Sequence, residues 1–183
     1  MTHSILKRLG IFFLPLGLCL NLVVNAAETP QVLTDIQSEN MAPNWMISTV
    51  SGKELSLYSE LEQGNSVVMV FWASWCRHCR ELLPAINTLN QEIEGRKIKI
   101  FALNIWEDGE PLRYLNNKKI ELETALKCDN VAKRFGIKGT PGVIVVGPDK
   151  KIVYRRQAGQ KVNEVIAKIK DVTHWAPDPA AKK

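Results

Sequence analysis

The sequence predicts an α/β protein whose central mixed β-sheet is flanked by helices. Two continuous apolar runs, at 66–72 and 98–104, lack the alternation of a half-exposed strand and are typical of parallel strands buried on both faces. Between them, apolar residues recur at helical spacing over 76–94, which indicates a strand–helix–strand unit. Later, the segments 143–146 and 151–155 flank a turn and predict an antiparallel pair, so the sheet is expected to be mixed.

Shorter elements complete the expected domain. At its start, 44–49 and 54–57 predict a β-hairpin whose turn contains Gly52, a residue that adopts turn conformations at little cost. Pro84 lies inside the long helical segment and is expected to kink it, because proline cannot donate the backbone hydrogen bond of a helix. Two short helices, each followed by extended sequence, and a final helix are predicted at 110–119, 130–135 and 162–169.

The two ends of the chain are expected to lie outside this domain. Residues 1–26 combine a basic start, an apolar stretch and small residues at the end, which is typical of a secretory signal peptide; a retained membrane anchor is the alternative. A linker over 27–40 is expected to lead into one domain over 41–173, followed by a flexible tail at 174–183. In either case the domain is exported, and in a bacterial cell the periplasm is the expected location.

The charge of the chain excludes one large class of partners. The formal net charge is +5, and loss of Lys7 and Arg8 with the signal peptide lowers it to about +3. The remaining basic residues are scattered along the chain and are not concentrated on one predicted face. Nucleic acid is therefore not an expected partner.

Three of the four cysteines, Cys76, Cys79 and Cys128, follow the predicted signal peptide. This odd number does not indicate a framework of structural disulfides. A zinc site needs four ligands, and here there is no second C-x-x-C and there are only two histidines, His78 and His174, after the signal peptide. We therefore expect no metal site and no other cofactor. For Cys128, both a small buried residue and a regulatory or intermolecular thiol are open interpretations.

The spacing of Cys76 and Cys79 indicates redox chemistry. Cys76 stands at the start of the predicted long helix, where the helix dipole is positive, and Arg77, His78 and Arg80 add positive charge within one turn. A free thiol titrates at about 8.5, and this environment is expected to lower the pKa of Cys76. We therefore expect Cys76 to attack disulfides and Cys79 to resolve the mixed disulfide. An inert disulfide is the alternative.

Several motifs resemble those of the thioredoxin superfamily, and the match runs from about residue 41 to residue 159. Around the cysteines they are Phe71-Trp72-Ala73-Ser74-Trp75-Cys76-x-x-Cys79 with a later Pro84. Other motifs are similar to those of the exported TlpA/ResA-like branch: Ala42-Pro43-Asn44-Trp45, Gly52-Lys53-x-x-x-Leu57 and Phe135-Gly136-Ile137-x-Gly139-Thr140-Pro141. The resemblance implies a thioredoxin-like fold with an N-terminal β-hairpin extension.

The resemblance also implies how the site is built. Cys76 and Cys79 would form the redox-active disulfide, and a cis peptide between Thr140 and Pro141 would lie opposite Cys76. The backbone of Thr140 would pair with the extended chain of a substrate, in the manner of an added β-strand. Trp75 is expected to cover the disulfide.

The chain departs from the family pattern at three positions near the cysteines. His78 stands where relatives of this branch carry proline, and a histidine beside the thiolate is expected to make the disulfide a better oxidant. Leu82 occupies the position of a glutamate of the branch, and Val70 that of a buried aspartate of cytoplasmic thioredoxins. Glu81 is one residue from the usual position and is expected to point away, as a solvated charge or a substitute proton acceptor.

Together, these features predict an exported protein thiol-disulfide oxidoreductase that exchanges disulfides with protein substrates. A membrane redox partner would recycle the cysteine pair, and a monomer is expected. The resemblance implies a disulfide reductase of the cytochrome c maturation type. Arg77 and His78 instead favour a disulfide oxidase or isomerase.

Two functions without disulfide exchange are weaker alternatives. A module that delivers copper or haem on the same fold would be expected to use a C-x-x-x-C spacing and a distant histidine, and here the spacing is one residue shorter and His174 is the one distant histidine after the signal peptide. A thiol peroxidase would need a single activated cysteine, which the close partner Cys79 does not suit.

Overall fold

The computed structural model describes residues 40–174. The predicted signal peptide at 1–26, the linker up to residue 39 and the tail from residue 175 lie outside the described residues. Between residues 40 and 174, no helix is both long enough and apolar enough to cross a membrane.

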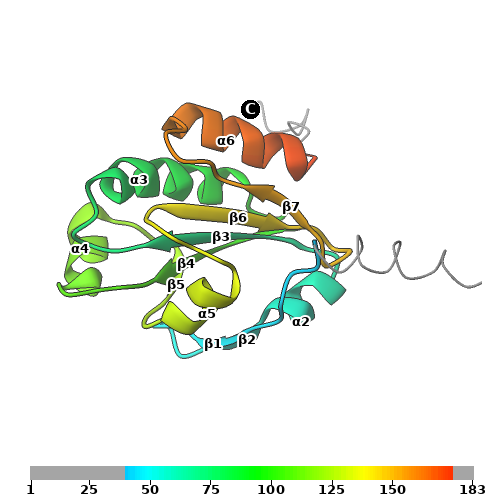
Figure 1. The fold of residues 1–183 in the computed structure, drawn as a ribbon, viewed down its shortest axis with the longest axis horizontal. Helices are drawn as coiled ribbons and strands as arrows, with labels where there is room; N and C mark the ends of the chain where they lie inside the picture. The colour runs from blue at the N-terminus through cyan, green and yellow to red at the C-terminus, as the bar shows by residue number, and fades with distance from the viewer. Residues whose placement is uncertain (1–39, 175–183) are drawn as a thin grey trace, which may run out of the picture.

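The described residues alternate between strands and helices, as predicted (Figure 1). In chain order the elements are β1 (Met46–Ser48), β2 (Glu54–Ser56), α2 (Leu57–Glu62), β3 (Ser66–Trp72), α3 (Arg77–Glu92), β4 (Ile98–Asn104), α4 (Pro111–Lys118), β5 (Glu123–Ala125), α5 (Asp129–Arg134), β6 (Gly142–Val146), β7 (Ile152–Arg155) and α6 (Val162–Val172).

A five-stranded sheet with the order β5-β4-β3-β6-β7 forms the centre of the domain. The central strand β3 pairs in parallel with β4 and antiparallel with β6. The outer strands continue these two arrangements: β5 pairs in parallel with β4, and β7 pairs antiparallel with β6. The predicted mixed sheet and thioredoxin-like architecture are confirmed.

Helices cover both faces of this sheet (Figure 1). On one face lie α3 and α6, and on the other lie α2, α5 and the small β1–β2 sheet. The side chains of β3 alternate between these layers: Val68, Val70 and Trp72 pack with α3 and α6. Their neighbours Val67, Met69 and Phe71 pack on the opposite side. Because both faces are covered, β3 has no polar face, which explains its continuous apolar sequence.

The N-terminal hairpin extension is also confirmed. Strands β1 and β2 pair antiparallel, with Ile47 opposite Leu55. Gly52 in the connecting turn has a φ of 85°, a conformation that glycine adopts without a steric penalty. The backbone N–H of Val50 donates to the carbonyl of Thr124 at 2.8 Å, which joins the hairpin to the residues of β5.

The sequence analysis missed helix α2. It assigned Leu57 to the end of a strand, whereas Leu57 begins the helix after Ser56. Leu57 and Leu61 are one helical turn apart and are both buried against the sheet. A helix this short does not repeat its apolar spacing often enough to be recognised, so its burial against β3 decides its structure.

The long helix α3 places the cysteine motif. It runs from Arg77 to Glu92, close to the predicted 76–94, and continues through Pro84. Its apolar stripe, which packs on the sheet, contains Leu82, Leu83, Ile86 and Leu89. The final helix α6 ends at Val172, three residues later than predicted, and is packed against α3 through Val165 and Ile169.

Candidate active site

Cys76 and Cys79 are joined by a disulfide at the N-terminus of α3. Cys76 is the N-cap residue, and its Sγ accepts the backbone N–H of Cys79 at 3.2 Å. Cys76 is 5% exposed, whereas Cys79 is completely buried. A substrate sulfur can therefore reach Cys76 more readily than Cys79, and the sulfur of Cys76 lies at the positive end of the helix dipole.

The surroundings of Cys79 are apolar. Val70 and Leu82, which stand where relatives carry acidic residues, are buried in the same cluster as Cys79. Glu81 faces outward, with its Oε2 atom 3.5 Å from Nδ1 of His78 and its Oε1 atom 3.9 Å from Nε of Arg77. The expected outward orientation of Glu81 is thus confirmed. Its carboxylate is a counter-charge to the two exposed side chains that follow Cys76.

The positive side chains near Cys76 differ in their surroundings. The side chains of Arg77 and His78 are 90% and 72% exposed, so solvent screens the charge of Arg77, and that of His78 when it is protonated. Arg80 is more constrained, because its Nε donates to the carbonyl of Ser74 at 3.0 Å and its guanidinium lies 6.0 Å from the ring centre of Tyr114. Of these side chains, Arg80 is therefore the one fixed against the loop before Cys76.

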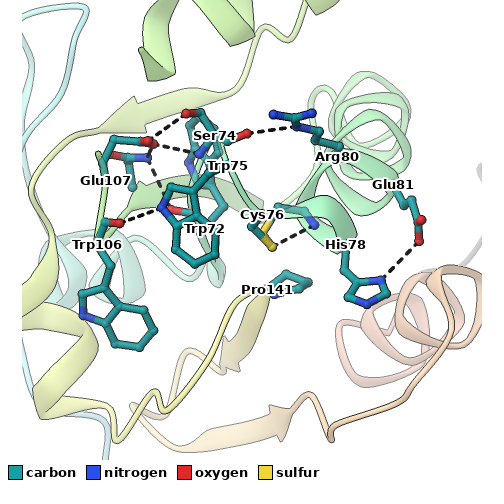
Figure 2. Close-up of a disulfide and its surroundings, with 12 residues drawn as sticks. Trp72, Ser74, Trp75, Cys76, His78, Arg80, Glu81, Trp106, Glu107 and Pro141 are labelled. Carbon is teal, nitrogen blue, oxygen red and sulfur yellow. Dashed lines mark hydrogen bonds and ion pairs between the residues drawn. A yellow bond between two sulfur atoms is a disulfide. The ribbon is translucent and has the colours of Figure 1, made fainter. Parts of the chain in front are cut away.

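A loop before β6 completes the site. The Thr140–Pro141 peptide is cis, as the resemblance implied. Phe71 pairs with Gly142, so Pro141 lies beside the end of β3, from which the chain leads to Cys76 (Figure 2). Within residues 40–174, neither the backbone N–H nor the carbonyl of Thr140 makes a hydrogen bond. An extended chain that approached this loop would find both groups free to pair.

Two exposed tryptophans lie on one side of Cys76, and His78 with Glu81 lies on the other (Figure 2). The indole N–H of Trp75 donates to the carbonyl of Trp106 at 2.8 Å, and both side chains are exposed. Trp106 has a φ of 50°, and its backbone N–H donates to Asp129 at 2.9 Å. Trp72 is buried in the core, and its ring makes a tilted contact with Tyr114, with the ring centres 5.8 Å apart.

Glu107 is a site residue that the sequence analysis missed. Its Oε2 atom accepts the backbone N–H of Ser74 at 2.8 Å and the side-chain amide of Asn104 at 2.6 Å. Its Oε1 atom accepts the hydroxyl of Ser74 at 2.7 Å and the backbone N–H of Gly109 at 3.0 Å. Burial alone would raise the pKa of Glu107, but the hydrogen bonds from Ser74, Asn104 and Gly109 outweigh it and hold the pKa below its ordinary value. Glu107 therefore fixes the loop that carries Cys76.

A signal for Glu107 was present in the sequence. It follows β4 by three residues, and β4 lies parallel to β3. The carboxyl ends of two adjacent parallel strands meet at one edge of a sheet, so polar residues after β4 are candidates for contact with the loop after β3.

Cys128 lies away from the disulfide, in the cluster on the other face of the sheet. It is buried before α5, and its thiol donates weakly to the carbonyl of Leu126 at 3.6 Å. Burial, together with the nearby carboxylate of Asp129, raises the pKa of Cys128 to about 12. The interpretation as a small buried residue is therefore the one that the surroundings support.

A groove of about 640 Å³ opens beside the active site. It begins at His78 and the Thr140–Pro141 loop and continues to the turn between β7 and α6. Its volume is in the range of sites that bind ligands or peptide side chains. Across residues 40–174 there is no group of three or more His, Cys, Asp or Glu side chains that could hold a metal ion.

Known proteins resemble this chain in sequence and in fold. The family model described as AhpC/TSA matches residues 39–155. The thiol-disulfide oxidoreductase ResA of Bacillus thuringiensis subsp. konkukian is 22% identical over 134 residues, which cover 72% of this chain and 76% of ResA.

Two solved structures illustrate the similarity of the fold. One, described as a thiol:disulfide interchange protein DsbE from Chlorobium tepidum, has a TM-score of 0.64 at 20% identity and covers 73% of this chain and 96% of its own. The other, StoA from Bacillus subtilis, has a TM-score of 0.59 at 15% identity and covers 71% of this chain and 98% of its own. With its Cys76–Cys79 pair on this fold, the chain belongs to the AhpC/TSA family and is a thiol-disulfide oxidoreductase of the ResA type.

Proposed function

We propose that this protein is an exported disulfide reductase for protein substrates, of the type used in cytochrome c maturation. The observation that carries the exchange reaction is the position of Cys76 and Cys79 at the start of α3, beside the loop in which the backbone of Thr140 is unpaired. An extended substrate chain paired with Thr140 would bring its own disulfide to Cys76.

The reaction is a pair of sulfur exchanges. The thiolate of Cys76 attacks one sulfur of the substrate disulfide, so a mixed disulfide forms and the other substrate sulfur leaves as a thiolate. The thiolate of Cys79 then attacks the sulfur of Cys76 and releases the second substrate thiolate. Two electrons pass to the substrate, and the Cys76–Cys79 disulfide remains. A membrane redox partner returns two electrons to this pair.

Five further residues support the pair in this proposal. Trp75 shields the side of the disulfide that faces Trp106. Pro141 leaves a gap without an N–H in which the substrate chain approaches, and Thr140 pairs with that chain. Arg77 and His78 favour the thiolate of Cys76, although their exposure weakens the effect.

The exposure of these two side chains is the reason to prefer reduction over oxidation. Arg77 and His78 are the residues that favour a disulfide oxidase or isomerase, and both lie near the carboxylate of Glu81. A counter-charge reduces the stabilisation that a cation gives to the thiolate form, and each stabilised thiolate makes a disulfide more oxidising. Their contribution to an oxidising potential is therefore small.

The redox potential tests the direction of electron flow. The Cys76–Cys79 pair is equilibrated with glutathione buffers, with Cys128→Ala as the parent protein so that one pair titrates. A potential below about −250 mV supports the reductase, whereas one above about −180 mV supports an oxidase or isomerase. The absence of any redox transition would contradict disulfide exchange itself.

A trapping experiment tests the roles of the two cysteines. In Cys79→Ala, the mixed disulfide at Cys76 cannot be resolved, so this variant is expected to retain substrate proteins after purification under conditions that block free thiols. Cys76→Ala is the matched control and is expected to retain none. Equal retention by the two variants would contradict the assigned order of attack.

We also propose that residues 1–26 are a signal peptide and that the domain works as a monomer in the periplasm. The basic start and apolar stretch of residues 1–26 support export. N-terminal sequencing of protein from the periplasmic fraction is expected to begin at Ala27. An intact N-terminus in the membrane fraction would instead support the anchor, and light scattering would measure the oligomeric state.

A further inference from the structure

The groove beside the active site has a strongly positive lining. Its cations are Lys138, Arg155, Arg156 and Lys161, and they lie between the Thr140–Pro141 loop and the start of α6. We call this surface, from His78 to Lys161, the cationic groove. Glu81 is the one carboxylate among the residues that line it.

That carboxylate does not neutralise the groove. Glu81 stands at the end next to His78, where it is within ion-pair distance of both Arg77 and His78. Glu164, on the first turn of α6, is not among the lining residues, and its Oε2 atom accepts the backbone N–H of Lys161 at 3.0 Å. The middle of the groove therefore keeps its positive charge.

Two hydrogen bonds hold Arg156, one of the lining residues of the groove, in place. Its Nη1 atom donates to the carbonyl of Pro141 at 3.0 Å, and its Nη2 atom donates to the carbonyl of Gln160 at 3.0 Å. Gln160 is fixed in turn, because its side-chain oxygen accepts the hydroxyl of Tyr154 at 2.9 Å and the backbone N–H of Gln157 at 2.7 Å. Arg156 thus connects the loop that would hold the substrate with the turn between β7 and α6.

Two lysines of the cationic groove have ammonium groups that are free to bind a ligand. Lys138 and Lys161 are exposed, and within residues 40–174 their ammonium groups have no hydrogen bond or ion pair. A lysine ammonium can donate three hydrogen bonds and is attracted to carboxylates across a shared surface. Two free ammonium groups and a fixed guanidinium line the same groove, and together they form a site that fits an acidic side chain.

The position of the groove gives this charge a role in substrate choice. Thr140 and Pro141 line one end, and they are the residues beside which the substrate chain would run. A β-strand advances by about 3.3 Å per residue and turns alternate side chains to the same face. Side chains within a few residues of the reactive cysteine of a substrate can therefore enter the groove.

We propose that the cationic groove selects disulfide substrates that carry Asp or Glu within a few residues of the reactive cysteine. Lys138 and Lys161 attract the acidic side chain, and Arg156 positions the Pro141 loop and adds a fixed positive charge to the groove. The inference rests on the proposed disulfide exchange and adds to it the chemistry of the preferred substrate.

Three peptides test this selection. They share one sequence with a single cysteine, joined as a mixed disulfide to the chromophore thionitrobenzoate, and differ in whether the flanking residues are Glu, Gln or Lys. The reduced protein supplies two electrons, its cysteines become a disulfide, and the peptide thiol and thionitrobenzoate are released. We expect the rate constant for the Glu peptide to exceed that for the Gln peptide about fivefold, and the Lys peptide to be slowest.

Variants assign the selection to the groove. Lys138→Gln/Lys161→Gln is expected to remove most of the preference for Glu, and Lys138→Arg/Lys161→Arg is expected to keep it. Lys118→Gln/Lys133→Gln removes the same charge from the ends of α4 and α5, outside the groove, and is expected to keep the preference. Raising the salt concentration should reduce the preference of the unaltered protein.

The outcomes separate the two proposals. If the unaltered protein reacts with none of the peptides, the proposed disulfide exchange fails. If it reacts with all three at equal rates, exchange stands and the inference about the groove is wrong. The Glu preference could also survive in Lys138→Gln/Lys161→Gln and be lost in Lys118→Gln/Lys133→Gln. Another part of the surface would then select the substrate, and the inference about the cationic groove would be wrong.

Discussion

The carboxylate of Glu107 binds Ser74 through both the backbone N–H and the hydroxyl, at 2.8 Å and 2.7 Å. Ser74 lies two residues before Cys76, and its carbonyl accepts the side chain of Arg80 on α3. Glu107, three residues after β4, therefore fixes the geometry of the loop after β3. Through Arg80 this loop is joined to α3, which begins after Cys76 and contains Cys79.

Replacing Glu107 by Gln should destabilise the fold. An amide has one oxygen where the carboxylate has two, so some of the donors from Ser74, Asn104 and Gly109 lose their acceptor. We expect the free energy of unfolding at neutral pH to fall by about 1–3 kcal/mol, measured by urea denaturation. Glu110→Gln is the control, because Glu110 pairs with Arg113 on the exposed surface. An equal loss in both variants would contradict a special role for Glu107.

The effect of Glu107→Gln should depend on pH. The folded protein holds the pKa of Glu107 below its ordinary value of 4.5. The unfolded chain therefore binds protons at a higher pH than the folded one, and the stabilisation from this carboxylate is complete above the unfolded pKa and lost as pH falls through the folded pKa. The difference in unfolding free energy between the unaltered protein and the Glu107→Gln variant should be constant above about pH 5.5 and shrink below about pH 4.5. A constant difference down to about pH 3 would contradict the lowered pKa.

His78→Pro should lower the redox potential of the Cys76–Cys79 pair. His78 is in the first turn of α3, where its backbone N–H makes no hydrogen bond among the described residues, so proline fits without losing one. The change removes an imidazole that favours the thiolate. We expect a small shift, of about 30 mV or less, in a glutathione equilibrium, because the side chain is exposed. His78→Ala separates the loss of the imidazole from the gain of the ring, and an unchanged potential in both variants would exclude His78 as a determinant.

Cys128 should not react in the native state. Burial and Asp129 raise the pKa of its thiol to about 12, so little thiolate is present at about pH 8. In oxidised protein that begins at Ala27, a thiol reagent such as dithionitrobenzoate is expected to label nothing before unfolding and one thiol per chain in urea. Cys128→Ala should give no labelling in either state. Rapid labelling of the native protein would contradict this expectation and would support a regulatory role for the Cys128 thiol.

The sequence by itself determined the features that depend on local chemistry. The apolar runs of β3 and β4 could be identified because a strand buried on both faces has no polar alternation, and Cys76 could be placed at a helix start because the motif lies between a strand and helical spacing. The mixed sheet, the hairpin and the cysteine pair follow from such patterns within short segments.

The tertiary structure alone decided which distant residues meet. Ser74 and Glu107 are 33 residues apart, and Arg156 and Pro141 are 15 apart, so their contacts depend on strand register and loop geometry. Helix α2 likewise forms because Leu57 and Leu61 are buried against the sheet, a cause that six residues of sequence do not display. Local sequence patterns reflect how much of each element is buried, whereas the Thr140–Pro141 loop and the cationic groove are built by contacts between elements.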